Sequence, residues 1–176
     1  MLDIADIVTR DIHVELSHVM GDENTKVRRA AYRLAERLND EHTLQILRDM
    51  TQTEASDKVI PAIRALGRIK AVQGIPVLVD ILNKAKNQDV QIACCQALGQ
   101  IADPAGMDVL IRIVTPRGLL SLQRKYGENL RAAATFALAQ ISHPQVLKVM
   151  KSLSEDSDPR VRRTALAVLK TGTTQR

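Results

Sequence analysis

Apolar and polar residues follow a helical period along this chain, and one short pattern recurs at near-regular intervals. The clearest copy is Val90–Ile101, with close copies at 58–69 and 130–141 and looser ones at 27–38 and 161–172. From the starts at 27, 58, 90, 130 and 161, the steps are 31, 32, 40 and 31 residues. Repetition at such a period indicates an array of stacked structural repeats.

Apart from Lys58 at position 1 of its copy, the copies place apolar or small residues at positions 1, 4, 5, 8, 9 and 12, which is the spacing of one face of an α-helix. Residues suited to capping a helix, Asn24, Asn87 and Asp158, come three positions before a copy. A second apolar helix is predicted after each of the first four copies, where large apolar side chains recur six and nine positions on. These residues are Leu44, Ile75, Met107 and Leu147, then Leu47, Leu78, Leu110 and Met150.

The pattern therefore predicts helix pairs, each with a first helix (A) and a second helix (B) that carries the recurring copy. Two helices alone cannot bury their apolar faces, whereas stacked pairs share one continuous core. The predicted fold is an all-α solenoid, or superhelix, that forms a single domain over 1–176. Its five pairs span about 3–38, 41–69, 73–101, 104–141 and 144–172.

The fourth pair holds an insertion at 115–127, between its two helices. It carries three leucines, Leu119, Leu120 and Leu122, together with basic residues. Loops of this length in compact repeats are often functional, so one hypothesis is a docking loop. The other is a segment that folds back over the seam between repeats, which the three leucines favour.

The motifs Val27–Ala31, Ala65–Ile69, Ala97–Ile101 and Asp158–Ala165 resemble HEAT repeats, in particular the short bacterial type named after phycobilisome lyases. The resemblance covers about 20–172. It implies an α-solenoid whose B helices line a concave face, and that face commonly binds proteins in this family. The family also includes chromophore lyases, but nothing in this sequence marks a chromophore site, so that activity is not carried over.

Positions 3, 7 and 11 of each B helix lie opposite the apolar face, so they are predicted to line the binding face. The first two repeats present arginines at matched positions, which suits carboxylates or phosphates through bidentate hydrogen bonds. The middle repeats present glutamines, which can bond a peptide backbone, and the single phenylalanine. The candidate partner-binding residues are Arg29, Arg33, Arg37, Arg64, Arg68, Gln96, Gln100, Phe136 and Gln140.

Each of these groups has a plainer interpretation. The arginines also fit a solvated helix face, with some paired to acids such as Glu36, because amphipathic helices expose charge in any case. Phe136 also fits a core position, since aromatic side chains favour burial. Both alternatives stay open on the sequence alone.

Composition narrows the partner only partly. Aromatic residues make up 2% of the 176 residues, so the core is predicted to be aliphatic, and the net charge of +5 permits an acidic partner or a nucleic acid without selecting either. Scarce aromatics for base stacking count against nucleic acid. The predicted function is a protein-binding scaffold whose partner is acidic in one version of the hypothesis. The alternatives are a nucleic-acid-binding module or a structural or regulatory module of a larger protein, and self-association also stays open.

No catalytic constellation is visible. The histidines His13, His18, His42 and His143 are scattered, and Gly-rich phosphate loops and metal-ligand spacings are missing from the sequence. Cys94 and Cys95 are adjacent and lie within a predicted helix, which indicates buried free thiols. The sequence thus predicts a protein that is not an enzyme and needs no cofactor or metal. It has no secretory signal and no apolar stretch long enough for a membrane, so the cytoplasm is the predicted location.

Overall fold

A computed structural model describes residues 4–52, 56–115 and 126–173, which are helical with short connections and contain no strand. The described helices are α1 (Ile4–Met20), α2 (Thr25–Leu38), α3 (Glu41–Met50), α4 (Ser56–Arg68), α5 (Ile75–Lys84), α6 (Gln88–Ile101), α7 (Met107–Val114), α8 (Glu128–Gln140), α9 (Pro144–Leu153) and α10 (Pro159–Thr173). Short 3₁₀ turns at Val72–Gly74 and Pro104–Gly106 lead into α5 and α7. The all-α class is confirmed.

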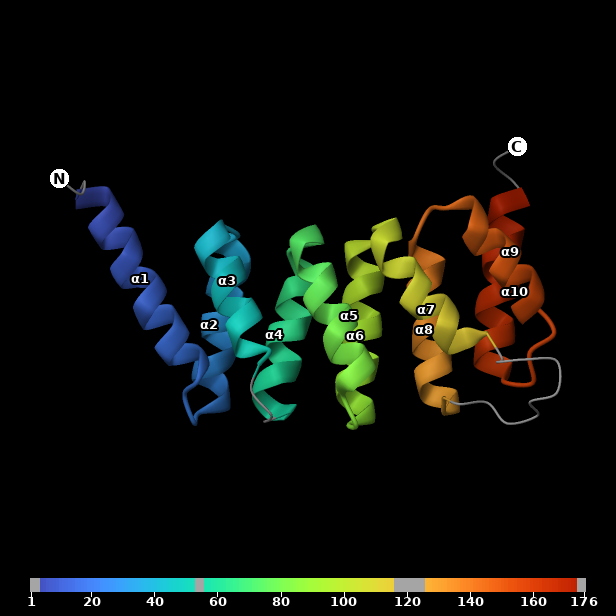
Figure 1. The fold of residues 1–176 in the computed structure, drawn as a ribbon, viewed down its shortest axis with the longest axis horizontal. Coiled ribbons are helices and arrows are strands. Elements are labelled where there is room, and N and C mark those ends of the chain that lie inside the picture. The colour runs from blue at the N-terminus through green and yellow to red at the C-terminus, as the bar shows by residue number, and fades with distance from the viewer. Residues whose placement is uncertain (1–3, 53–55, 116–125, 174–176) are drawn as a thin grey trace.

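The helices stack in chain order into one elongated row, with the two ends of the chain at opposite ends of the row (Figure 1). The B helices α2, α4, α6, α8 and α10 each pack against the next B helix. Among the described residues, the A helices α3, α5, α7 and α9 make at most slight contact with one another. The B layer is thus packed more tightly than the A layer, as expected for the inner layer of the predicted solenoid.

Two glycines at matched positions allow the central B helices to approach this closely. A Cβ atom added to Gly67 would lie 2.8 Å from the Cα atom of Ala97, and one added to Gly99 would lie 2.7 Å from the Cα atom of Ala137. Glu36 occupies the matched position in α2. There the helices α2 and α4 pack less closely, and the Glu36 carboxylate accepts a hydrogen bond of 2.7 Å from Nε of Arg68.

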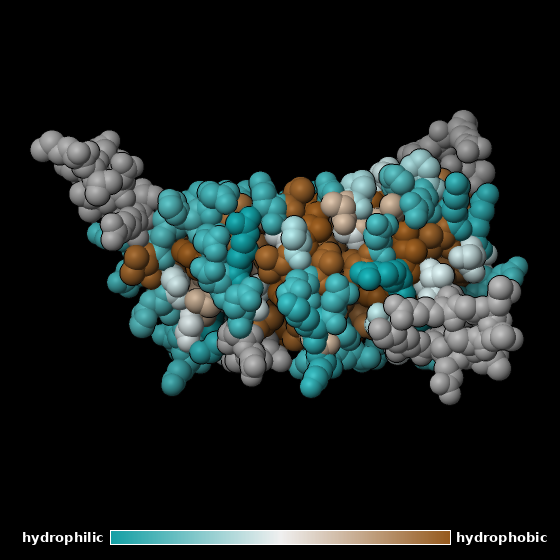
Figure 2. All heavy atoms as spheres, in the orientation of Figure 1, coloured by the Kyte–Doolittle hydropathy of each residue, from teal (hydrophilic) through white to brown (hydrophobic). Residues whose placement is uncertain are grey.

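The core is aliphatic, as composition predicts. The leucines at one matched position, Leu66, Leu98 and Leu138, are at most 1% exposed. Figure 2 shows that apolar side chains also reach the surface along the middle of the row, between more hydrophilic edges. Such a two-layer stack has no second shell of helices, so each repeat depends on its neighbours for burial.

The predicted caps are confirmed at all three residues. Asn24 accepts a hydrogen bond from the backbone N–H of Lys26, Asn87 from that of Asp89, and Asp158 from that of Arg160. The predicted insertion 115–127 lies mostly outside the described residues, since 116–125 are not described. Both hypotheses for it therefore stay predictions.

A recurring side-chain hydrogen bond joins three of the B helices to the loops that precede them. The side chain at the second position of the copy donates a hydrogen bond to the carbonyl oxygen six residues earlier. Arg28 bonds Asp22 at 2.8 Å, Gln91 bonds Ala85 at 2.9 Å, and Arg162 bonds Asp156 at 2.6 Å. These bonds satisfy carbonyl groups in loops that would otherwise lack a partner in the helix ladder.

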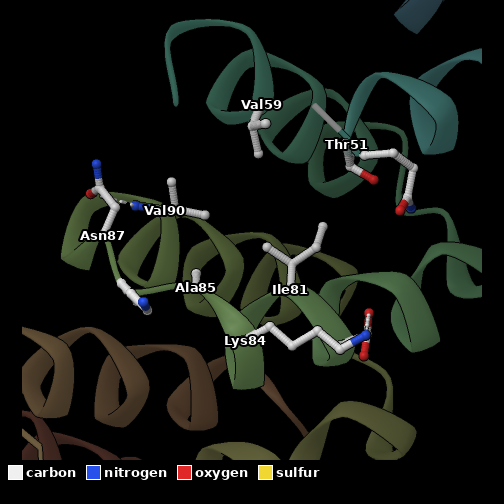
Figure 3. Close-up of a pocket in the computed structure, with 10 residues that line it drawn as sticks. Thr51, Val59, Ile81, Lys84, Ala85, Asn87 and Val90 are labelled. Carbon is white, nitrogen blue, oxygen red and sulfur yellow. Dashed lines mark hydrogen bonds and ion pairs between the residues drawn. The ribbon is translucent and has the colours of Figure 1, made fainter. Parts of the chain in front are cut away.

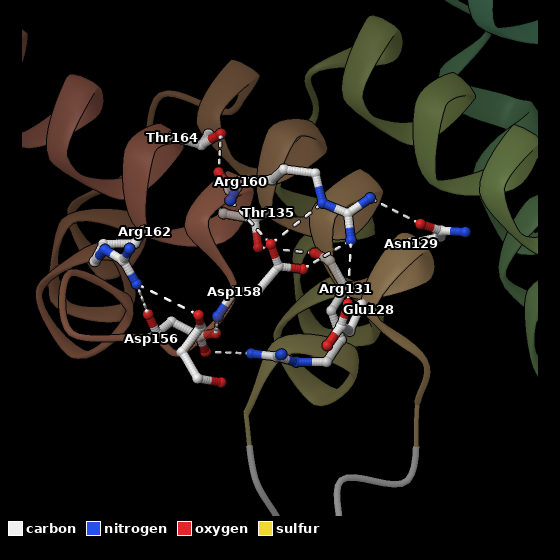
Figure 4. A network of polar contacts seen from close by, with 10 residues as sticks. Glu128, Asn129, Arg131, Thr135, Asp156, Asp158, Arg160, Arg162 and Thr164 are labelled. Carbon is white, nitrogen blue, oxygen red and sulfur yellow. Dashed lines mark hydrogen bonds and ion pairs between the residues drawn. The ribbon is translucent and has the colours of Figure 1, made fainter.

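Arg131 holds the same position in α8 but points to a different partner (Figure 4). Its guanidinium forms an ion pair with Asp156, in the loop between α9 and α10, and the two side chains are 2% and 4% exposed. Asp156 also accepts a hydrogen bond of 2.9 Å from the backbone N–H of Asp158. Hydrogen bonds from Arg160 in turn hold the pKa of Asp158 below its usual range. This network fastens the last helix pair to α8.

Candidate binding face on the B helices

All nine predicted binding residues lie on the exposed side of the B helices. Positions 7 and 11 of the copy are exposed in every repeat, from α2 through α10. Because these helices pack side by side along the row, the two positions form one continuous surface. We call this surface, from α2 to α10, the B face.

Arginines dominate the α2–α4 end of the B face. Arg29, Arg33, Arg37 and Arg64 are exposed and form no ion pair with another described residue. Arg68 differs, since its guanidinium forms an ion pair with Glu36 of the neighbouring helix. The interpretation of the arginines as paired surface charge thus holds for Arg68, while the other four keep their hydrogen-bond donors open to a partner. Exposure makes them available, and their role in binding stays a prediction.

The α6–α8 part of the B face is uncharged. Gln96, Gln100 and Gln140 are exposed, and Gln100 lies over the seam between α4 and α6, with its Oε1 2.6 Å from where a Cβ of Gly67 would be. Half-buried side chains at position 3, Ile60, Ile92 and Ala132, add apolar surface beside them. This region offers amide groups next to apolar contact area, which suits a peptide backbone and its aliphatic side chains.

Phe136 belongs to this surface and is 58% exposed. The interpretation of Phe136 as a core residue is therefore wrong. The reason is steric: the neighbouring Ala137 fits directly against Gly99, and this contact between α6 and α8 leaves no space for a ring. An exposed phenylalanine in the middle of a B face is a natural anchor for an apolar group, because aromatic side chains dominate interface energetics.

A pocket of about 640 Å³ lies away from the B face, between the ends of the α3–α4 and α5–α6 pairs. Figure 3 shows Thr51, Ile81 and Asn87 around it, with Lys84 bonded to Asp80 at 2.9 Å. None of the nine predicted binding residues lines it. Its walls mix small apolar groups with a solvated ion pair and bring together no catalytic set.

Cys94 and Cys95 are buried free thiols, as predicted. Burial raises the pKa of Cys95 to about 12, and burial together with the neighbouring Cys95 raises the pKa of Cys94. The thiolate is the reactive form of cysteine, so both side chains are chemically inert within the fold. Among the described residues, no group of three or more His, Cys, Asp or Glu side chains is placed to hold a metal ion.

Family models provide an independent comparison. The model for HEAT repeats matches residues 60–117 and 116–174, which together make up more than half of the chain. The chain belongs to the HEAT-repeat family. No curated protein sequence matches it. Within the described residues, no helix has the length and apolar character needed to cross a membrane.

Solved structures share this HEAT fold at low sequence identity. The complex of CpcE and CpcF of phycocyanin lyase from Nostoc sp. PCC7120 is 17% identical with a TM-score of 0.68, covering 90% of this chain and 65% of that chain. A designed armadillo repeat protein in complex with the peptide (KR)4 is 14% identical with a TM-score of 0.59, covering 95% and 84%. An engineered protein is 20% identical with a TM-score of 0.60, covering 97% and 82%. These likenesses support the solenoid fold alone.

The sequence analysis missed two exposed apolar residues on B helices, Leu34 and Leu166, each 44% exposed. Leu34 is at position 8 of its copy, which the pattern assigns to the core, whereas Leu166 is at position 6, which the pattern assigns to neither the core nor the binding face. The signal that identifies them is their place in the first and last repeats, where no further described B helix stacks against them.

Proposed function

We propose that this HEAT-repeat chain is a non-catalytic scaffold that holds an extended segment of a partner protein along its B face. The acidic part of that segment lies against α2 and α4, and an apolar side chain lies against Phe136. One observation carries the proposal: Arg33 and Arg64, at the same position of adjacent helices, are exposed and form no ion pair among the described residues, on a surface that continues into amides and an exposed aromatic ring.

The spacing of the arginines favours an extended peptide. Helices in contact have axes about 8–10 Å apart, so Arg33 and Arg64, at the same position of α2 and α4, are separated by a similar distance. A chain in the extended polyproline II conformation has three residues per turn and rises about 3.1 Å per residue, so side chains three residues apart lie on the same side, about 9 Å from each other. Carboxylates three residues apart on such a chain therefore match the arginines of successive helices, and each guanidinium can bind one of them in a bidentate manner.

The charge of the B face supports an acidic partner. The designed armadillo repeat protein with a related fold holds a basic peptide, (KR)4. The α2–α4 end of the B face is itself basic, like that peptide. By the same logic of complementary charge, its partner segment carries Asp or Glu where that peptide carries Lys or Arg.

Reversing the charge of Arg33 and Arg64 should weaken binding of an acidic peptide at least about tenfold, because like charges then face the carboxylates. The probe is a labelled peptide with Glu at every third residue and Leu near one end, measured by fluorescence anisotropy. Arg112→Glu, on the exposed surface of the A helix α7, is the matched control and should leave the affinity unchanged. Equal affinities for Arg33→Glu/Arg64→Glu and wild type would overturn the proposal.

Replacing Glu36 with glutamine should have the opposite effect and tighten acidic-peptide binding by several-fold. Glu36 forms an ion pair with Arg68, so the Arg68 guanidinium is already engaged within the chain. Removing its charge makes Arg68 available and lowers the local negative charge. The same anisotropy titration, with Arg68→Gln added in a second variant, tests this origin: the gain should vanish in the double variant. An unchanged or weaker affinity for Glu36→Gln alone contradicts the assignment of Arg68 to the binding face.

Nucleic acid is the competing class because guanidinium groups also bind phosphate. The salt dependence separates the two, since each phosphate contact on duplex DNA contributes about −0.9 to the slope of log K against log salt concentration. If an oligonucleotide binds more tightly than the acidic peptide, with a slope of about −3 or steeper, the B face binds nucleic acid rather than a protein segment.

A further inference from the structure

The first and last helix pairs expose apolar side chains at positions that are buried in the inner repeats. The counterparts of Leu34 are Ala65, Ala97 and Ala137, all at most 1% exposed, and the last two pack against the preceding B helix. The counterparts of Leu166 are Ile63, Cys95 and Thr135, all 0% exposed. Leu34 and Leu166 themselves are 44% exposed. Leu166 therefore marks a repeat-to-repeat contact surface that has no described helix against it, and Leu34 marks one that α1 covers only in part.

At the α1 end, this surface is hollowed. The axis of α1 diverges from the row of helices (Figure 1), and a pocket of about 350 Å³ lies between α1 and α2. It is lined by Leu16, Val19 and Ala31, with Ile12 and Leu34 at its exposed rim. Its remaining lining residues, Asp11 and Glu15, lie one helical turn apart on α1. The α1 end is thus an apolar notch with an acidic edge.

At the α10 end, the exposed surface around Leu166 is basic. Leu166 lies one turn after Arg163 on the same face of α10, and both are exposed. Lys170 lies one turn after Leu166, and α10 contains no acid, whereas α1 contains three acids and one arginine. The two end surfaces are therefore both partly apolar and opposite in charge.

We propose that a second copy of this chain docks its α10 surface into the α1–α2 notch. Leu166 of one copy enters the apolar pocket, and Arg163 lies against Asp11 and Glu15. The two contacting surfaces differ, so the contact is head-to-tail and leaves one free notch and one free α10 surface on every pair. Further copies can add to both free surfaces, as a ring or as an open filament, and the extent of assembly rises with protein concentration.

This contact is weaker than the joints inside the chain. The inner joints set Gly67 against Ala97 and Gly99 against Ala137. The end surfaces carry Leu34 where those joints have alanine and Lys170 where they have glycine. Backbones cannot approach as closely across such side chains, so the assembly is reversible and dissociates on dilution. It uses Arg163, at position 3 of the copy in α10, but none of Arg33, Arg64 and Phe136, on which the proposed peptide binding depends.

Sedimentation velocity over about a hundredfold range of concentration tests the proposal, because mass action makes the mean mass depend on concentration. Wild type should rise from the monomer mass of 19.5 kDa to twice that value and beyond. Leu34→Arg blocks the notch and Leu166→Arg blocks the α10 surface, so each variant alone should stay monomeric. Val72→Arg, at a 49% exposed apolar residue between α4 and α5, is the matched control and should assemble as wild type does.

An equimolar mixture of Leu34→Arg and Leu166→Arg decides between modes of contact. Each pair of variants retains one intact notch and one intact α10 surface, so the mixture should form a 1:1 dimer and nothing larger. A mixture that stays monomeric, or one that grows beyond the dimer, overturns the head-to-tail contact. A wild-type mass that is constant at 19.5 kDa across the range overturns self-association altogether. Circular dichroism of each variant verifies that its helices are intact.

Discussion

Arg131→Met should lower the free energy of unfolding by about 3–5 kcal/mol, the effect expected when one partner of a buried ion pair is removed. The Arg131 guanidinium and the Asp156 carboxylate are 2% and 4% exposed, so water cannot replace the lost partner. Methionine has a similar shape but no charge, so the buried Asp156 carboxylate loses its ion pair with Arg131 while it keeps the hydrogen bond from the backbone N–H of Asp158. Urea unfolding followed by circular dichroism gives the free energy directly.

The same variant should loosen one part of the chain before the rest. Asp156 lies in the loop between α9 and α10, while Arg131 lies on α8, so the pair joins the last helix pair to the solenoid. Repeat proteins unfold by repeats and interfaces, and the weakest interface opens first. Hydrogen exchange in Arg131→Met should therefore accelerate in α9 and α10 while α4 and α6 stay protected.

Asp156→Asn provides the control for this interpretation. Asparagine keeps the oxygen that accepts the backbone N–H of Asp158, but it removes the charge. The double variant Arg131→Met/Asp156→Asn should be more stable than Arg131→Met alone, because it leaves no unpaired buried charge. Equal stabilities for these two variants would show that lost packing of the arginine side chain, rather than the orphaned charge, causes the effect.

The fold was predictable because every repeat carries the same helical pattern. Apolar positions at helical spacing recur in every copy, and caps such as Asn24 and Asn87 mark where B helices begin, so errors in one repeat are corrected by the others. The exposure of the candidate binding residues followed from the same periodicity. Whether these residues bind a partner is a different question, because a solvated helix face and a binding face obey the same periodic pattern.

Contacts that differ from repeat to repeat were not predictable. Arg131 shares its position with Arg28 and Arg162, so the column alone predicts a bond to the loop before it. It pairs with Asp156 instead, a residue 25 positions later. The pairing of Glu36 with Arg68 shows the converse case: the sequence offered Glu36 as a partner for an arginine, but the looser packing of α2 against α4 became visible only in the structure. Such contacts depend on distances between helices, which periodicity does not specify.

Of the two close contacts at glycines, the one between α6 and α8 is the closer, and a substitution of Gly99 tests it. Gly99→Val should lower the free energy of unfolding by about 3 kcal/mol or more, at or above the usual range for overpacking. Even a Cβ atom would lie 2.7 Å from the Cα atom and 2.9 Å from the Cβ atom of Ala137, and backbone atoms cannot turn aside as a flexible side chain does. The two helices must separate, which also displaces Phe136 from Gln96 on the B face. Binding of the acidic, leucine-bearing peptide should therefore weaken together with stability.

Gly74→Ala is the matched control for this steric argument. The atom nearest to an added Cβ there is the end of the Leu66 side chain, at 3.3 Å, which can move by a few tenths of an ångström. Its effect should stay within about 0.5 kcal/mol, as for substitutions that meet no fixed obstacle. Both variants can be compared in the same urea titration. If Gly99→Val unfolds at the same urea concentration as Gly74→Ala, α6 and α8 do not meet backbone to backbone, and the continuous B face loses its structural basis at its centre.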